Sequence, residues 1–194
     1  FAGLVLTDAE KNFVYSIFKN LLKSQKYKDL LGSTPVNLYF FKPIHPGFID
    51  GGAGYNNNDM AFFGYFRNGV LDKYKRSITI HESGHILSKR NGNNQLGMNL
   101  LSLISADGSA CYDYRHPRPY YLKTYAFRGR EGGNGGAKSE SFAEAVANNA
   151  ICFSGYPCTS AVGHAVTLND YPFACAATYA WIKNKVFGGV DVSQ

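Results

Sequence analysis

The sequence predicts an α+β fold in which a small N-terminal sheet and helices are followed by a helical C-terminal part. Three observations predict it. Apolar residues recur at helical spacing near the N-terminus, two aromatic-rich segments between residues 35 and 66 have the composition of strands, and helical patterns return after residue 78. Of the 194 residues, 45% are hydrophobic, which suffices for a sizeable core. We therefore expect one domain, residues 1–194, with an N-terminal lobe of about residues 1–90 and a C-terminal lobe of about residues 91–194.

The first helix is predicted by its start signal and its periodicity. Thr7 and Glu10 have the spacing of a capping box, in which each side chain bonds the backbone of the other residue. Apolar residues follow at helical spacing and continue to a stop at Gly32: Phe13, Val14, Ile17, Leu21, Leu22, Tyr27, Leu30 and Leu31.

Strands are expected at residues 35–42 (PVNLYFFK) and 60–66 (MAFFGYF), because both segments are rich in aromatic residues and bounded by turn-forming residues. The glycine- and asparagine-rich stretch between them, residues 47–58, is typical of a loop. Further helices are expected around residues 78–90, which end at Asn91-Gly92, and at residues 139–150 and 173–186, with an apolar segment at 98–104.

The most informative motif is His81-Glu82-Ser83-Gly84-His85, an HExxH sequence. Residues four apart lie on one face of a helix, so His81 and His85 can direct two imidazole nitrogens at one metal ion. Glu82 follows the first histidine, where its carboxylate can reach a metal-bound water and act as a general base. The pattern predicts a catalytic zinc site, and the alternative is a surface helix carrying two solvated histidines.

A catalytic zinc site needs a third protein ligand, and the spacing of the residues does not choose it. Glu140 and Glu144 lie on the helix predicted at residues 139–150, and acidic residues on a neighbouring helix commonly complete such sites. Asp107, Asp113 and His116 lie closer to the motif in sequence, in a less regular region.

The sequence HExGH followed by a helix reading E-x-F-A-E-A resembles the anthrax lethal factor-like metallopeptidases, which include the Pro-Pro endopeptidases. The resemblance spans roughly residues 81–146. It implies a zincin-like fold and a zinc-dependent peptidase in which Glu140 is the third ligand. It also implies that Tyr125, in the segment YAFRGR, assists catalysis. Glu144, four residues after Glu140 on the same predicted helix, is either support for a histidine or a surface carboxylate. The chain departs from the family in the longer interval from His85 to Glu140, in the glycine-rich stretch after Tyr125, and in its cysteines.

Four cysteines with no CxxC pair indicate two disulfides and secretion rather than a structural zinc site. The pairing Cys152–Cys158 with Cys111–Cys175 is slightly favoured, because a short turn-forming loop separates the first two. The first residue is Phe1, as expected of a processed, mature chain.

Net charge and the length of the apolar runs indicate which classes of partner are not expected. The net charge is +6, but the lysines are dispersed and no nucleic-acid motif is present, so we expect a solvated surface and no nucleic-acid partner. No apolar run approaches the ~20 residues of a membrane span.

We therefore expect a monomeric, secreted zinc endopeptidase that acts on a peptide or protein substrate. Tyr125 would stabilise the oxyanion, and the substrate would pair in extended form with an edge strand near residues 60–66. The alternatives are a zinc-binding toxin-like or adhesion protein without peptidase activity, and a different zinc peptidase with Asp107 or Asp113 as third ligand. Intact Glu82 argues against the first, because a purely structural site needs no base.

Overall fold

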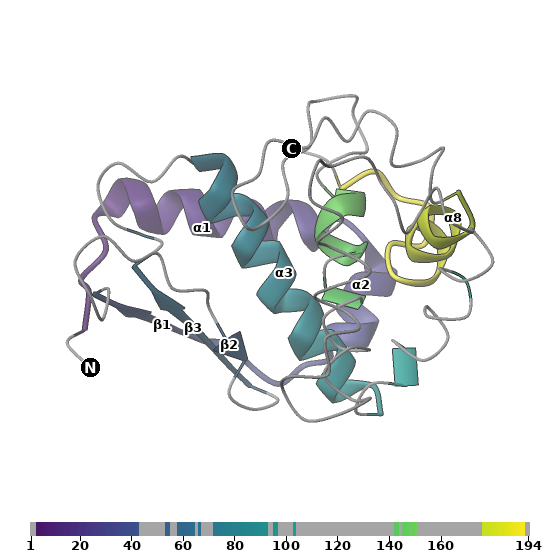
Figure 1. Cartoon of the computed structure of the whole chain (residues 1–194), viewed down its shortest axis with the longest axis horizontal. Coiled ribbons are helices and arrows are strands. Elements are labelled where there is room, and N and C mark those ends of the chain that lie inside the picture. The colour runs from purple at the N-terminus through teal and green to yellow at the C-terminus, as the bar shows by residue number, and fades with distance from the viewer. Residues whose placement is uncertain are drawn as a thin grey trace, which may run out of the picture.

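The computed structural model describes residues 3–42, 53–54, 58–64, 66, 72–92, 95–96, 103, 142–143, 145–150 and 176–192. Its named elements are, in chain order, α1 (Asp8–Leu21), α2 (Gln25–Leu31), β1 (Asn37–Phe41), β2 (Ala53–Gly54), β3 (Asp59–Phe63), α3 (Asp72–Arg90) and α8 (Ala176–Lys185). Residues 142–143 and 145–150 are also helical and are referred to below as the 142–150 segment, drawn in green in Figure 1. Helices and a small sheet in one chain confirm the predicted α+β fold.

The sheet has three strands in the order β1-β3-β2. β1 runs parallel to β3, with Asn37 opposite Asp59 and Phe41 opposite Phe63, and β2 pairs antiparallel with β3 at Met60 and Ala61. β3 is therefore the central strand, and it ends at Phe63 rather than extending to Phe66. The last four residues of β3 are all buried and apolar, which fits a central strand. A strand covered on both faces has no solvent-facing side, so its sequence does not alternate between apolar and polar residues. The expectation of an edge strand near residues 60–66 is therefore wrong, because β3 is hydrogen-bonded on both sides and the edges of this sheet are β1 and β2. β2 lies in a stretch predicted to be a loop.

The predicted N-terminal helix is confirmed, capping box included. The Glu10 backbone N–H donates to Thr7 Oγ1 at 3.3 Å, and the Thr7 N–H donates to the Glu10 carboxylate at 2.8 Å. The structure divides the predicted helical stretch into α1 and α2, because Ser24 caps a new helix by accepting a hydrogen bond from the Tyr27 N–H. α2 stops at Gly32, whose positive φ of 73° is a backbone angle that glycine adopts readily and other residues rarely do.

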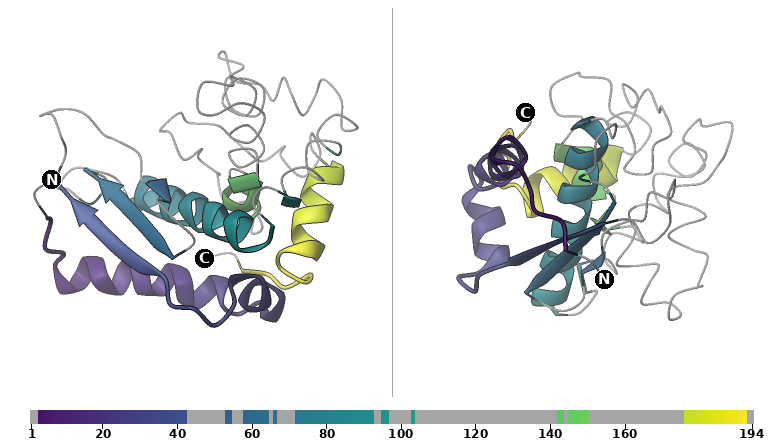
Figure 2. Two further views of the ribbon diagram at one scale, coloured as in Figure 1. Left: turned by 90° about the horizontal axis from the view of Figure 1, so that it is seen from below. Right: turned by 90° about the vertical axis from the view of Figure 1, so that its left-hand side faces the viewer.

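α3 lies in the middle of the fold. In Figures 1 and 2 it runs between α1 and α2 on one side and the 142–150 segment on the other, next to the sheet. Its apolar side chains enter two core clusters. Ile80 and Leu87 pack with residues of α1, α2, the 142–150 segment and α8, whereas Ile78 and Ile86 pack with residues of α1 and β3. Burial from several directions explains why α3 lacks one apolar stripe.

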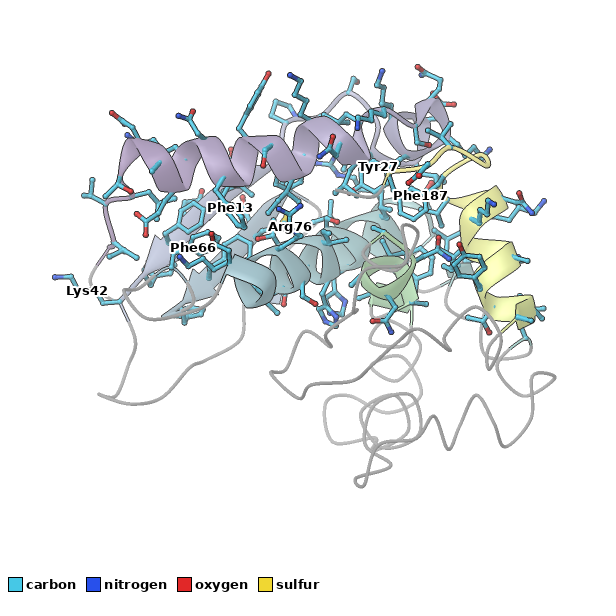
Figure 3. All side chains as sticks on the ribbon, turned by 90° about the horizontal axis from the view of Figure 1, so that it is seen from above. Phe13, Tyr27, Lys42, Phe66, Arg76 and Phe187 are labelled. Carbon is cyan, nitrogen blue, oxygen red and sulfur yellow. The ribbon has the colours of Figure 1, made fainter. Side chains whose placement is uncertain are left out.

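The residues that directly follow α8 pack against α2, as Figure 3 shows for Phe187 and Tyr27. Their rings stack with centroids 5.9 Å apart, and the buried Ser24 hydroxyl donates to the Phe187 carbonyl at 2.8 Å. Ser24 therefore both caps α2 and joins it to a segment far along the chain.

We predict that Ser24→Ala lowers the free energy of unfolding by about 2–3 kcal/mol, because it removes a cap and leaves the buried Phe187 carbonyl without its donor. Thr7→Ala is the matched control, since it removes a cap that makes no tertiary bond and should cost only about 1 kcal/mol. Urea unfolding of both variants gives the comparison, and equal losses would mean that the Ser24–Phe187 bond contributes nothing.

Candidate metal centre

The HESGH motif lies in the interior of α3, as predicted, and the side chains predicted to form the metal site are buried. His81 is 6% exposed, Glu82 2% and His85 8%. The whole stretch of α3 from residue 77 to residue 88 is buried. The alternative of two solvated histidines on a surface helix is therefore wrong.

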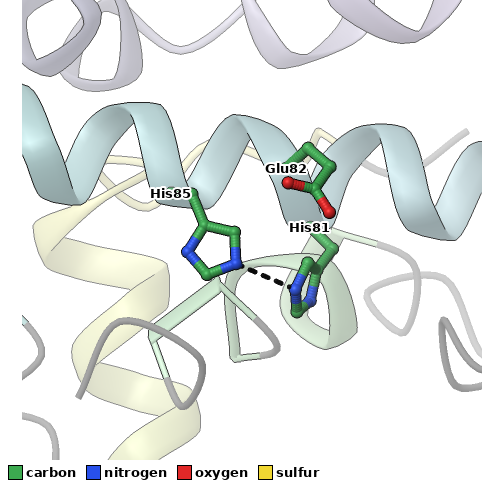
Figure 4. Close-up of side chains that lie close together, drawn as sticks. All are labelled: His81, Glu82 and His85. Atoms are coloured by element: carbon green, nitrogen blue, oxygen red, sulfur yellow. Dashed lines mark hydrogen bonds between the residues drawn. The ribbon is translucent and has the colours of Figure 1, made fainter. Parts of the chain in front are cut away.

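The two imidazoles converge on one point. Figure 4 shows both rings projecting from the same side of α3, and His85 Nε2 lies 3.1 Å from His81 Nε2. Two nitrogens bound to one tetrahedral zinc ion at roughly 2.0–2.1 Å lie about 3.3 Å apart, so the observed separation suits a shared metal. The donor atoms of His81, Glu82 and His85 all lie within 4.8 Å of one another. This buried group can hold a metal ion.

Lys89 lies two helical turns after Glu82 on α3, and its side chain is positively charged. Burial lowers the pKa of Lys89 below its ordinary value, and the negative charge of Glu82 opposes that shift. The two charges therefore interact, as expected for residues seven apart that share a helix face. Lys89 therefore supplies positive charge near the buried carboxylate of Glu82, and a buried charge is costly without such compensation.

The opposite side of the motif is packed against α2. Tyr27 is fully buried, and burial raises the pKa of its phenol, with the Ser83 side chain opposing the shift. The Ser83 hydroxyl itself donates to the Ile80 carbonyl at 2.6 Å. Ser83 therefore faces the core, whereas His81 and His85 face the other way.

The C-terminal end of α3 is tied to three other elements by polar bonds. The Arg90 guanidinium donates to the Leu31 carbonyl at the end of α2, to the Pro35 carbonyl before β1, and to Asn58 Oδ1 before β3. Asn91 Nδ2 donates to the Leu30 carbonyl at 2.7 Å. These bonds fix the motif helix relative to α2 and the sheet.

Next to the two histidines, α3 touches the 142–150 segment at Gly84. A Cβ placed on Gly84 would lie only 2.7 Å from Ala143 Cα. Phe142 is buried in the core, with its ring edge-on to Trp181 at 6.5 Å between centroids, which confirms that it packs this helix inward.

The structure thus brings together three of the predicted site residues, His81, Glu82 and His85. The other predicted ligands and catalytic residues lie outside the described residues, as do all the cysteines: Asp107, Cys111, Asp113, His116, Tyr125, Glu140, Glu144, Cys152, Cys158 and Cys175.

Sequence reasoning missed Lys89, Arg90 and Gly84 as parts of this region. Lys89 could have been found from its seven-residue spacing to Glu82. The role of Arg90 had no sequence signal, because its partners are backbone carbonyls distant in sequence.

None of the protein families compared with the chain matches it, and neither does any curated protein or any solved structure. Among the helices of the described part, none is long and apolar enough to cross a membrane.

We predict that Arg90→Lys lowers the free energy of unfolding by roughly 1–3 kcal/mol, because an ammonium cannot reproduce the forked guanidinium bonds to three acceptors. Lys19→Met, which changes an exposed residue of α1, should stay within about 0.5 kcal/mol of the wild type. Denaturant unfolding measures both, and an unchanged midpoint for Arg90→Lys would contradict the anchoring role.

Proposed function

We propose that this protein is a secreted zinc endopeptidase with a zincin-like fold, of the lethal factor-like type. One observation carries the proposal. The Nε2 atoms of His81 and His85 converge to 3.1 Å on a buried helix, beside the carboxylate of Glu82. Two imidazoles with an adjacent buried carboxylate form the donor set of a catalytic zinc peptidase. Secretion and the two disulfides remain part of the proposal, on the basis of the cysteine count.

The third ligand that we propose is Glu140. Close to it in sequence, Ala143 touches the motif helix at Gly84. Glu144 follows Glu140 by four residues, a spacing that puts both on one face of a helix, so periodicity does not choose between them. The resemblance favours the first glutamate of E-x-F-A-E, and on that basis we propose Glu140 as the ligand and Glu144 as a supporting carboxylate.

When bound, zinc would acidify a water molecule and polarise the scissile carbonyl. Glu82 would accept the proton of that water as it attacks, and would then deliver the proton to the leaving amine. His81 and His85 would present Nε2 to the metal, which leaves each Nδ1–H to hold its ring in place. Tyr125 is proposed to donate a hydrogen bond to the developing oxyanion.

The proposed substrate is a peptide in extended conformation. β2 is an edge strand, and it packs against α3, which carries the motif. A peptide adding to that edge would form main-chain hydrogen bonds beside the helix that carries the histidines.

We expect one zinc ion per chain and chelator-sensitive peptidase activity that returns when Zn²⁺ is restored. Glu82→Gln should keep zinc and lose activity on a diverse peptide library, because the amide cannot accept the proton. Metal analysis and cleavage profiling test the two parts separately. Zinc binding without cleavage by the wild type would instead favour a non-proteolytic zinc-binding protein.

Glu140→Ala should lower zinc affinity severely and abolish activity, because two imidazoles alone hold the metal weakly. Glu144→Ala should cost only about 10–100-fold in affinity or activity, as expected of a residue that supports a ligand. Metal titration of both variants decides between them. Normal zinc binding by Glu140→Ala would refute the assignment and direct the test to Glu144, Asp107, Asp113 or His116.

A further inference from the structure

At Gly84, α3 lies in close contact with the 142–150 segment. A Cβ built on Gly84 would meet three atoms of Ala143: Cα at 2.7 Å, Cβ at 3.2 Å and the carbonyl oxygen at 3.4 Å. Two of the three are backbone atoms, which cannot move unless the whole segment moves. The shortest contact falls about 0.7 Å short of the 3.4 Å at which ordinary van der Waals contact begins.

The backbone conformation gives no other reason for a glycine here. Position 84 lies inside α3, and Gly84 is not among the described glycines with positive φ. Glycine inside a helix is unfavourable relative to alanine, because it loses more conformational entropy on folding. What position 84 requires is the absence of a Cβ, so that the second helix can approach.

The contact lies inside the metal-binding motif. Gly84 directly precedes His85 and follows His81 by three residues, and the imidazoles project on the side where the 142–150 segment passes (Figure 4). Metal–ligand distances tolerate only about ±0.2 Å. A displacement of roughly 0.7 Å between the two helices is several times larger than this tolerance.

We propose that Gly84 is a positioning residue, which sets how closely the 142–150 segment approaches the two histidines and thereby the size of the metal site. This inference rests on the proposed function, in which a ligand from the helix containing that segment completes the site. It goes beyond that function by assigning a role to the motif position that carries no side chain. Gly84 itself touches neither metal nor substrate.

The test compares Gly84→Ala with Gly3→Ala, a matched control in which the added Cβ meets nothing within 4 Å. Dissociation constants for Zn²⁺ and for the larger Cd²⁺ are measured by chelator competition, with circular dichroism and thermal unfolding of the metal-free proteins. We expect Zn²⁺ affinity to fall about 10–100-fold in Gly84→Ala. Cd²⁺ affinity should fall less, because a widened site suits a larger ion, and Gly3→Ala should match the wild type.

The ratio of the two affinities separates positioning from general damage, since partial unfolding would weaken both metals alike. Unchanged Zn²⁺ affinity, or equal losses for Zn²⁺ and Cd²⁺, would overturn the inference while leaving the zinc site intact. A wild type that binds no zinc would overturn the proposed function as well.

A second variant covers the case in which Gly84→Ala does not fold. Ala143→Val crowds the same contact from the other helix while Gly84 stays intact, and it should shift the affinity ratio toward Cd²⁺ in the same direction. Failure of both variants to fold would overturn the inference, because the contact would then serve the core rather than the metal site.

Discussion

The central constraint on this fold is that one helix must be buried along most of its length while carrying polar and charged groups. Residues 77–88 of α3 are all buried, and they include two imidazoles and a carboxylate. Transfer of such groups from water is costly unless other charges or hydrogen bonds compensate. The arrangement of α1, α2, the sheet and the 142–150 segment around α3 follows from this requirement.

The different sides of α3 offset the cost of its burial in different ways. Ile80 and Leu87 fill one core cluster and Ile78 and Ile86 the other, so the apolar positions anchor the helix in both. On the polar side, the nitrogens of His81 and His85 lie 3.1 Å apart, and the charge of Lys89 acts on Glu82. A bound cation would complete this balance, because it compensates the carboxylate and accepts both imidazole nitrogens.

The sequence predicted the parts of the fold that depend on local signals. The Thr7–Glu10 capping box and Gly32 marked both ends of the first helical stretch, and the histidine spacing placed the motif on a helix. It did not predict β2, because a two-residue strand has no periodicity and depends on pairing with Met60 and Ala61. The bonds of Arg90 and the contact of Gly84 with Ala143 also escaped prediction. Both depend on residues brought close only by tertiary folding.

The hydrogen bond between Ser24 and Phe187 affects the order in which the protein folds. The two residues are 163 positions apart, and Tyr27, which stacks on Phe187, lies directly behind the motif helix. Contacts of such long range are entropically expensive to form early and are associated with slow folding. During synthesis the motif helix would emerge long before residue 187. The core cluster behind the histidines, which includes Ile182, Val186 and Phe187, is therefore complete only when α8 docks, so folding order and completion of the candidate metal site are coupled.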